Sequence, residues 1–430
     1  MTQSFFDAAV VGGGLTGLTA ATLLARRGAS VVVLERAREL GGRGATHTQD
    51  GFCFNLGAHA LYRGGAAARI LAELGVTWTG GLPSGRGLAE LGGRQYALPA
   101  TVGSLLTTGL LGWSAKAQGA RLFARLGSMD LKSLRGVPLG AWLDARVPDP
   151  TMRATFEAFV RVATYANAPA LADTAATLEQ LRRAQRPGVA YVDGGWATLV
   201  EGAAAAARAA GVTIRTGARV ACAATRDGGW SVSLQDDGAV ACGALVLATG
   251  PATARSIVPS DALAAWAERA VPLRAACLDV ALSRLPEPKA TFALGVDRPL
   301  YLSVHSAIAR VAPDGGALVS TMKYLPPTEP ANAADDEAEL EAWLDRLQPG
   351  WRDVLVHRRW LPAMVTSNAL VRAADGGRAG RPGPAVPDAP GVYVAGDWVG
   401  GEGMLLDAAL ASAARAADEA AARLPLREVA

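Results

Sequence analysis

Cysteine is scarce in this 430-residue chain, and the four that occur, Cys53, Cys222, Cys242 and Cys277, stand far apart. No two of them form a CxxC pair, so the sequence predicts neither a metal site nor a disulfide framework. Cysteines that are few and isolated suit a reducing cytosol.

An excess of charge of one sign is also lacking. The 42 lysines and arginines nearly balance the 39 aspartates and glutamates, which leaves a formal net charge of +3. This balance argues against nucleic acid as a partner, because such binding requires a strongly basic surface. With 50% hydrophobic residues the chain is not intrinsically disordered, and its tryptophans and tyrosines are too scattered to mark an oligomeric interface.

No apolar stretch is long enough, without interruption, to cross a membrane. Residues 95–115 carry no formal charge, but one proline and three glycines break them up. This pattern favours a core segment or a cavity wall. The alternative is peripheral contact with a membrane surface, because Lys116, Arg121 and Arg125 follow on an amphipathic helix. The N-terminal MTQSFFDAAVV has neither a basic region nor a cleavage site, so a cytoplasmic protein is expected.

What the chain does contain is AVVGGGLTGLTAATLLARRGASVVVLE, at residues 9–35. The pattern predicts a buried strand, a glycine-rich turn, a helix from about Leu15 to Gly28, and a second strand at residues 31–34. The second strand delivers an acid, Glu35, at its end. This order of elements is typical of a dinucleotide-binding fold.

The glycines of the turn, Gly12, Gly14 and Gly17, have the spacing GxGxxG. The first permits the tight turn, the second lets the backbone approach a pyrophosphate, and the third lets the helix pack on the strand. Leu15 and Thr16, which open the helix, are therefore candidate cofactor-binding residues as well. The alternative is that the glycines serve the tight turn alone.

Glu35 narrows the choice of dinucleotide. A carboxylate at this position accepts hydrogen bonds from ribose hydroxyls and repels a 2′-phosphate, so NADP is disfavoured while NAD and FAD remain. Arg36, next to it, is a further candidate contact.

The segment after the second strand helps to decide whether the cofactor is NAD or FAD. Gly41, Gly42 and Arg43 can lay backbone amides and a guanidinium along a second phosphate. With this GGR motif the chain resembles the flavoproteins that include amine oxidases, protoporphyrinogen oxidases and phytoene-desaturase-like enzymes, and it is most similar to the last branch. The resemblance implies FAD as the cofactor.

Two central segments match the same family. In GVTIRTGARVACAA, residues 211–224, we expect a strand pair around Gly217, and the resemblance implies that backbone near Val220 clasps the adenine. CGALVLATGPATA, residues 242–254, resembles the strand and turn that close the FAD domain at Gly250.

Two more segments extend the match to both ends of the chain. NLGAHALY, residues 55–62, resembles the segment that runs under the flavin, which makes Gly57 and Ala58 candidate contacts. Residues 391–421 predict a strand, a glycine-rich turn and a long alanine-rich helix. The resemblance implies that Gly396 and Asp397 meet the ribityl or pyrophosphate groups. It also implies that backbone amides at Gly403 and Met404, where a helix begins, face the pyrimidine end of the flavin.

These signals predict an α/β protein with a discontinuous, Rossmann-like FAD-binding domain and an inserted α+β substrate-binding domain. We expect the first to comprise residues 1–80, 188–272 and 385–430, and the second residues 81–187 and 273–384. Helical periodicity dominates residues 149–166 and 171–185, while the second insertion mixes short strands with an acidic helix at residues 335–347.

The resemblance implies an FAD-dependent oxidoreductase that takes a hydride from a C–H bond of an apolar small molecule. His59 is the one titratable group that it places near the reacting ring, as a candidate catalytic residue; a packed histidine bonded to backbone is the alternative. Because no second glycine fingerprint is present, O₂, a quinone or another soluble acceptor is expected to re-oxidise the flavin.

Two other functions are possible alternatives on the same fold, one catalytic and one not. One is a flavin amine oxidase or porphyrinogen oxidase, which the sequence favours less. Amine oxidases of this family commonly carry a lysine near the flavin, and the equivalent stretch here offers Arg274 and no lysine. The other is a non-catalytic carrier of a lipid or a protein.

Overall fold

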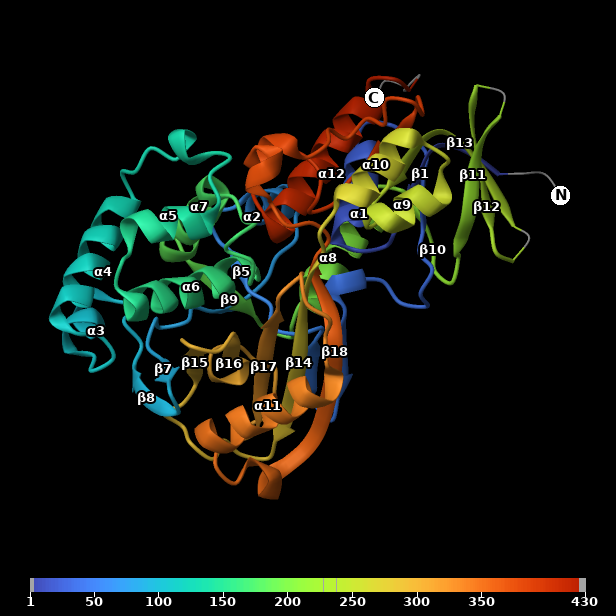
Figure 1. The fold of residues 1–430 in the computed structure, drawn as a ribbon. Helices are drawn as coiled ribbons and strands as arrows, with labels where there is room; N and C mark the ends of the chain where they lie inside the picture. Colours follow the sequence, from blue (N-terminus) through green and yellow to red (C-terminus); the bar gives the residue numbers. More distant parts are fainter. Residues whose placement is uncertain (1–3, 227, 237, 425–430) are drawn as a thin grey trace.

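A seven-stranded sheet joins the two ends and the middle of the chain in the computed structural model, which describes residues 4–226, 228–236 and 238–424 (Figure 1). Its strands are β1 (Ser4–Val11), β2 (Val31–Leu34), β10 (Thr213–Arg215), β11 (Val220–Arg226), β12 (Gly229–Leu234), β13 (Ala239–Leu247) and β19 (Val392–Val394). The strand order is β10-β2-β1-β13-β12-β11, and β19 pairs with the end of β13. The core strands β10, β2, β1, β13 and β19 run parallel.

Helices cover both faces of this sheet, and alternate residues of β1 face one helical layer or the other. The helices are α1 (Leu15–Ala25), α2 (Ala66–Leu74), α8 (Ala197–Ala209), α9 (Pro251–Ile257), α10 (Asp261–Arg269) and α12 (Leu405–Ala421). Ala8 and Val10 pack with α1, α2, α8 and α12, whereas Ala9 and Val11 pack with α9 and α10. Burial on both faces explains why the strands read as continuous apolar runs. The predicted α/β class is confirmed.

The first β-α-β unit forms as predicted, with one difference at the helix end. The strand at residues 31–34 is β2, and α1 begins at Leu15 but ends at Ala25. Gly28, with φ +88°, lies in the turn beyond the helix.

The expectation of a strand pair at residues 211–224 is wrong. Both strands exist, but β10 pairs with β2 and β11 pairs with β12, so they lie on opposite edges of the sheet. Between them, Gly217 and Ala218 donate backbone hydrogen bonds to the carbonyls of Ala37 and Glu35, at 2.7 and 2.8 Å. These contacts lead the chain past the end of β2, which prevents a hairpin.

A second seven-stranded sheet lies beside the first and has the order β18-β14-β17-β16-β15-β7-β8. Its strands are β7 (Leu88–Leu91), β8 (Arg94–Ala97), β14 (Leu273–Leu282), β15 (Phe292–Gly295), β16 (Leu300–Val304), β17 (Ala317–Leu325) and β18 (Leu355–Ser367). Helix α11 (Ala333–Leu347), the predicted acidic helix, packs on one face through Leu340, Trp343 and Leu344.

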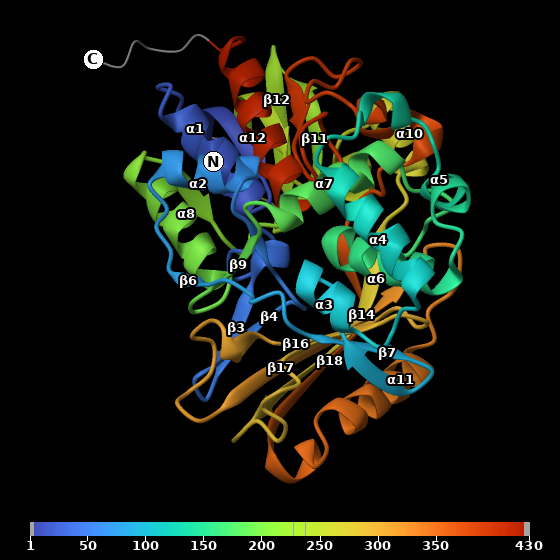
Figure 2. The same ribbon diagram turned by 90° about the vertical axis from the view of Figure 1, so that its left-hand side faces the viewer.

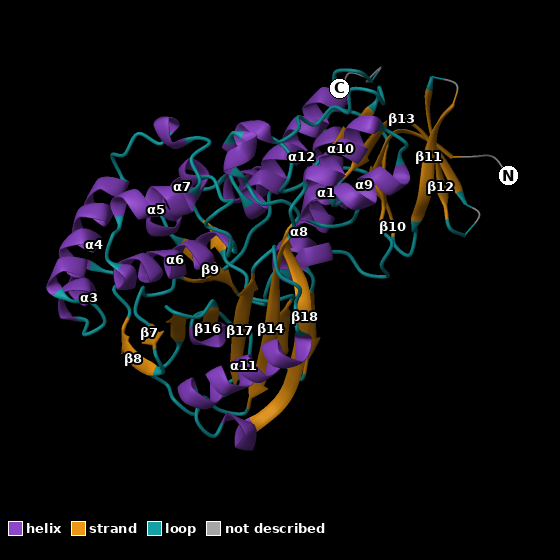
Figure 3. Ribbon diagram, viewed as in Figure 1, coloured by secondary structure: helices purple, strands orange, loops and turns teal. Residues whose placement is uncertain are grey.

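A layer of helices from the first insertion packs on the other face of the second sheet (Figure 3). These are α3 (Val102–Thr107), α4 (Trp113–Leu126), α5 (Leu139–Arg146), α6 (Pro150–Thr164) and α7 (Thr174–Gln185). The predicted helices α6 and α7 begin at aspartate N-caps, because Asp149 and Asp173 accept the backbone N–H of Met152 and Ala176.

Short elements complete the described chain. The strands are β3 (Thr46–Gln49), β4 (Phe52–Asn55), β5 (Leu61–Tyr62), β6 (Gly80–Gly81) and β9 (Val189–Val192). The 3₁₀ turns are η1 (Gly42–Gly44), η2 (Lys132–Leu134), η3 (His305–Ala307), η4 (Trp351–Val354), η5 (Ala373–Asp375) and η6 (Gly377–Gly380).

The uncharged stretch at residues 95–115 is only partly a core segment. Its Leu105, Leu110 and Leu111 are buried, but Val102 and Leu106 on α3 are exposed. None of its residues lines the large cavity described below, so the prediction of a cavity wall is wrong. Across the described residues, no helix combines the length and the apolar character that crossing a membrane requires.

Candidate functional site

A cavity of about 1070 Å³ lies between the first sheet, its helices and the end of β18. Most of the predicted site residues line it, although they come from distant parts of the chain. They are Gly12, Gly14, Leu15, Thr16, Glu35, Arg36, Gly42, Arg43, Ala58, His59, Val220, Gly250, Gly396 and Asp397. Four predicted residues, Gly17, Gly57, Gly403 and Met404, do not line it.

The glycine turn shapes one end of the cavity by close backbone approach. Gly12 has φ +110°, and a Cβ there would lie 2.6 Å from the carbonyl oxygen of Ala248. A Cβ on Gly17 would lie 1.9 Å from the carbonyl oxygen of Gly12. Gly17 thus holds α1 against the turn without facing the cavity itself.

Helix α1 begins at this turn with no side-chain cap. Its N-cap is Gly14, and Leu15 and Thr16 in its first turn line the cavity. Uncapped backbone N–H groups and the positive end of the helix dipole form an anion-binding site. This end of the cavity therefore fits a pyrophosphate.

Glu35, which directly follows β2, lines the same end of the cavity. Its carboxylate oxygens accept the backbone N–H of Gly13 at 2.6 Å and of Ala37 at 2.8 Å. Burial with these donors holds the carboxylate at the cavity wall, beside Arg36 and the stretch around Val220. The arrangement fits a ribose, whose hydroxyls donate hydrogen bonds to a carboxylate.

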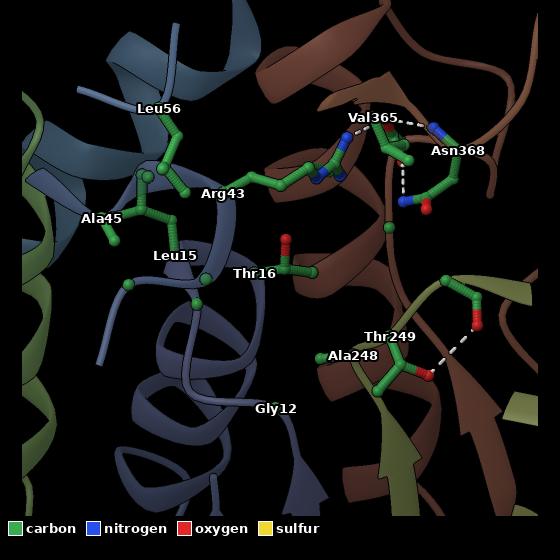
Figure 4. A pocket seen from close by; sticks show the side chains of 18 of the residues that line it. Gly12, Leu15, Thr16, Arg43, Ala45, Leu56, Ala248, Thr249, Val365 and Asn368 are labelled. Carbon is green, nitrogen blue, oxygen red and sulfur yellow. Dashed lines mark hydrogen bonds and ion pairs between the residues drawn. The ribbon is translucent and has the colours of Figure 1, made fainter. Parts of the chain in front are cut away.

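Arg43 reaches across the cavity from η1 to the far wall (Figure 4). Its Nη1 donates to Asp397 Oδ2 at 2.8 Å and to the carbonyl of Thr366 at 3.1 Å. Asn368 completes this cluster, because its backbone N and its Nδ2 donate to the two oxygens of Asp397 at 3.0 and 2.8 Å. Three segments distant in sequence thus meet at one carboxylate.

The charge of Asp397 is fixed by these neighbours. Burial alone would raise the pKa of its carboxyl, but the Arg43 charge and the hydrogen bonds from Arg43 and Asn368 lower that pKa from 3.8 to about 2. Asp397 is therefore ionised throughout the physiological range.

Helix α12 also begins at the cavity without a side-chain cap. Its N-cap is Met404, but Leu405 and Leu406 line the cavity, two residues after the predicted Gly403 and Met404. Met404 is buried in a small cluster outside the cavity, and the Gly403 carbonyl accepts a hydrogen bond from Arg381 at 3.0 Å. Leu405 has φ +54°, a left-handed conformation that a leucine rarely adopts.

Both ring nitrogens of His59 face backbone carbonyls. Nδ1 lies 2.9 Å from the Gly57 oxygen and Nε2 lies 3.1 Å from the Arg43 oxygen. Burial lowers the pKa of His59, despite the two carbonyls, and the charges of Arg43 and Arg359 lower it further. The ring also packs on Trp196, with 4.5 Å between centroids. This geometry favours the packed histidine over a proton donor.

Part of the cavity lining is apolar. It is formed by Leu56, Ala58, Ala60, Met364, Leu405 and Leu406. Tyr165 contributes its ring, and its hydroxyl donates to the Ala58 carbonyl at 2.7 Å. Gly57 lies behind this wall, where a Cβ would approach Met364 Cε to 2.5 Å.

Sequence reasoning missed Asn368, Met364 and Tyr165. Each lies in a stretch predicted to belong to the substrate-binding insertion, and no local motif marks it. The pairing of β18 with β14 places Met364 beside Ala275, and Asn368 follows the end of β18.

The residues present fit FAD. Two uncapped helix N-termini face one elongated cavity, a glycine cradle leaves room for backbone contact, and a carboxylate and a guanidinium lie along the same wall. No lysine is found among the described residues that line it.

Comparison with known proteins agrees with this geometry. A family model described as flavin containing amine oxidoreductase matches residues 15–421. Coproporphyrinogen III oxidase of Propionibacterium freudenreichii subsp. freudenreichii is 33% identical over 161 residues, which are 34% of this chain and 29% of that protein. Carotenoid 3,4-desaturase of Haloarcula japonica is 51% identical over 51 residues, 12% of this chain and 10% of that protein. The matched stretches thus span less than a third of these relatives' own lengths.

The likeness to solved structures extends over nearly the whole chain. Putrescine oxidase bound to putrescine superposes with a TM-score of 0.75 at 18% identity, over 97% of this chain and 99% of that chain. At this identity, the comparison establishes a common fold.

Proposed function

The chain belongs to the flavin-containing amine oxidoreductase family and is an FAD-dependent oxidoreductase, and we propose that it takes a hydride from a C–H bond of an apolar substrate. When bound, FAD supplies the hydride acceptor. The proposed activity is that of a desaturase or dehydrogenase.

One observation carries the choice of an apolar substrate. The apolar part of the lining is built from leucine, alanine and methionine, and two carboxylates of the lining, Asp397 and Asp407, already have partners. Asp397 is paired with Arg43 at 2.8 Å, and Asp407 accepts the Ala67 N–H at 2.9 Å and lies 3.3 Å from Arg183. Neither Asp397 nor Asp407 is therefore free to pair with a cationic amine. A hydrocarbon needs no such partner and is stabilised by burial against the apolar side chains.

The predicted residues that line the cavity have proposed roles in this reaction. We propose that Gly12, Gly14, Leu15 and Thr16 hold the pyrophosphate and that Glu35 binds the ribose. The α12 N-terminus would favour negative charge at the opposite end of the cavity, through its free N–H groups and dipole. The amides there belong to Leu405 and Leu406, next to the predicted Gly403 and Met404.

Hydride transfer requires two further contributions from the side chains. The apolar wall excludes water and positions the C–H bond. Loss of the hydride and of a proton from the neighbouring carbon leaves a C=C bond, and the proton passes to solvent. O₂, a quinone or another acceptor then takes the two electrons, and protons with them.

We also propose the division into domains that the sequence predicts. The first sheet with its helices would bind the dinucleotide, and the second sheet with α3 to α7 would form the substrate side.

The substrate class is tested by anaerobic mixing of the FAD-loaded protein with phytoene, with a porphyrinogen and with putrescine. We expect the flavin absorbance to bleach with phytoene alone. Met364→Glu should slow this bleaching at least about tenfold, because it places a charge in the apolar wall, while Val356→Glu, on the exposed part of the same strand, should not. Bleaching by putrescine or by the porphyrinogen would assign the alternative oxidase activity, and a chain that binds no FAD would be a carrier.

His59→Gln provides a second test. Because both ring nitrogens lie within 3.1 Å of backbone carbonyl oxygens, we expect the rate of flavin reduction to fall less than about tenfold. The pH profile of flavin reduction should be the same in the wild type and the variant. Loss of a step below 6.5, where burial places the His59 pKa, together with a decrease of about 10²–10⁴-fold, would identify His59 as a general acid or base.

A further inference from the structure

Large apolar side chains are exposed on α3 and at the start of α4. Val102 is 78% exposed, Leu106 54% and Trp113 80%. Figure 2 shows both helices on the side of the molecule that faces the viewer, within the helical layer formed by the first insertion. Exposed tryptophan and leucine at this density are typical of a surface that meets a partner.

These side chains form one continuous surface. Val102 and Leu106 are one turn apart on α3, so they share a face. Lys116 on α4 joins this face to Trp113, because its Nζ donates to the Leu106 carbonyl at 2.7 Å and lies 5.0 Å from the Trp113 ring centroid. We call Val102, Leu106, Trp113 and Lys116 the α3–α4 face.

The segment of the chain that carries the α3–α4 face is basic. Residues 91–129 contain Arg94, Lys116, Arg121 and Arg125 and no acidic residue, although the whole chain is nearly neutral. Arg94, Arg121 and Arg125 are exposed. An apolar surface whose own segment carries these exposed arginines, its basic border, is complementary to an anionic interface whose interior is apolar.

We propose that the α3–α4 face binds the surface of a lipid bilayer that contains anionic lipids. Tryptophan and leucine would enter the headgroup boundary, where an amphipathic ring is well placed, and the arginines would lie over the anionic headgroups. A second copy of the chain fits less well, because a symmetric dimer would bring the same basic border against itself. The contact is peripheral and does not depend on the proposed chemistry.

The experiment is co-sedimentation of the FAD-loaded full chain with vesicles of phosphatidylcholine, with and without phosphatidylglycerol. We expect binding to the anionic vesicles, weakened about tenfold by Leu106→Ser with Trp113→Ser. Arg121→Gln and Arg125→Gln should each weaken it about fivefold. Phe5→Ser is the matched control, because Phe5 is 66% exposed on β1, far from this surface in sequence and fold, and it should leave binding unchanged.

The flavin spectrum of each variant reports that it is folded. The proposal is overturned if the wild type stays in solution, if it binds neutral and anionic vesicles equally, or if the double variant binds like the wild type. Light scattering gives the remaining outcome: a dimer that the double variant dissociates, without vesicle binding, would assign the α3–α4 face to a second copy of the chain.

Discussion

Replacing Gly17 by alanine is expected to abolish FAD binding and to lower the free energy of unfolding by about 3 kcal/mol. The added Cβ would lie 1.9 Å from the Gly12 carbonyl oxygen and 3.3 Å from the Ala248 side chain. Since the nearest atom is backbone, no side-chain rotation relieves the contact, and α1 must move away from the glycine turn. Alanine gains up to about 1 kcal/mol of helix propensity over glycine, which is too little to offset the clash.

Gly14→Ala is the matched control for this prediction. Its nearest neighbour would be the Gly41 carbonyl oxygen at 3.4 Å, an ordinary contact, so the free energy of unfolding should change by less than about 1 kcal/mol. Because Gly14 lines the cavity, its methyl group should still weaken FAD binding. Urea unfolding and FAD titration of both variants measure the two effects. A Gly17→Ala protein that binds FAD and unfolds like the wild type would refute the close packing of α1 on the turn.

Asp397→Ala is expected to release FAD and to destabilise the protein by about 3 kcal/mol, since breaking a buried ion pair leaves the remaining charge uncompensated. This loss is at the low end of the range for buried ion pairs, because 42% of the Arg43 side chain is exposed and water can solvate its charge. The change would also leave the Asn368 amide without its acceptors. Asp418→Ala serves as the control, because Asp418 is exposed and should contribute less than about 1 kcal/mol through its pair with Arg27.

The lowered pKa of Asp397 predicts that part of the protein's stability is lost in acid. Its pKa is about 2 in the folded protein against an ordinary 3.8, so the unfolded chain binds this proton more readily. The stabilisation is fully present above pH 4 and is lost as the pH falls toward 2, by about 2 kcal/mol in all. Asp397→Asn should remove this component of the pH dependence. If wild type and variant lose stability in parallel over that range, other groups account for the acid sensitivity.

The sequence by itself determined the β1-α1-β2 unit, the glycine turn and Glu35, whereas Asp397 was predicted through the family resemblance. These features are local: apolar periodicity, glycine at positions that a side chain would block, and an acid at a strand end act within a few residues of one another. The same holds for α6, α7 and α11, whose caps and periodicity lie within the helices themselves.

Only the tertiary structure decided which residues complete the site and which surfaces stay exposed. Asn368 contacts Asp397, and Met364 and Tyr165 line the cavity, because β18 and α6 are positioned by strand pairing and packing over long sequence separations. Long-range packing also separated β10 from β11 and placed the His59 ring between two backbone carbonyls. It also left Trp113 in solvent, although its segment reads as apolar. The hydrophobicity of a side chain determines how much free energy its burial would contribute. Whether it is buried depends on the neighbours that the fold places around it.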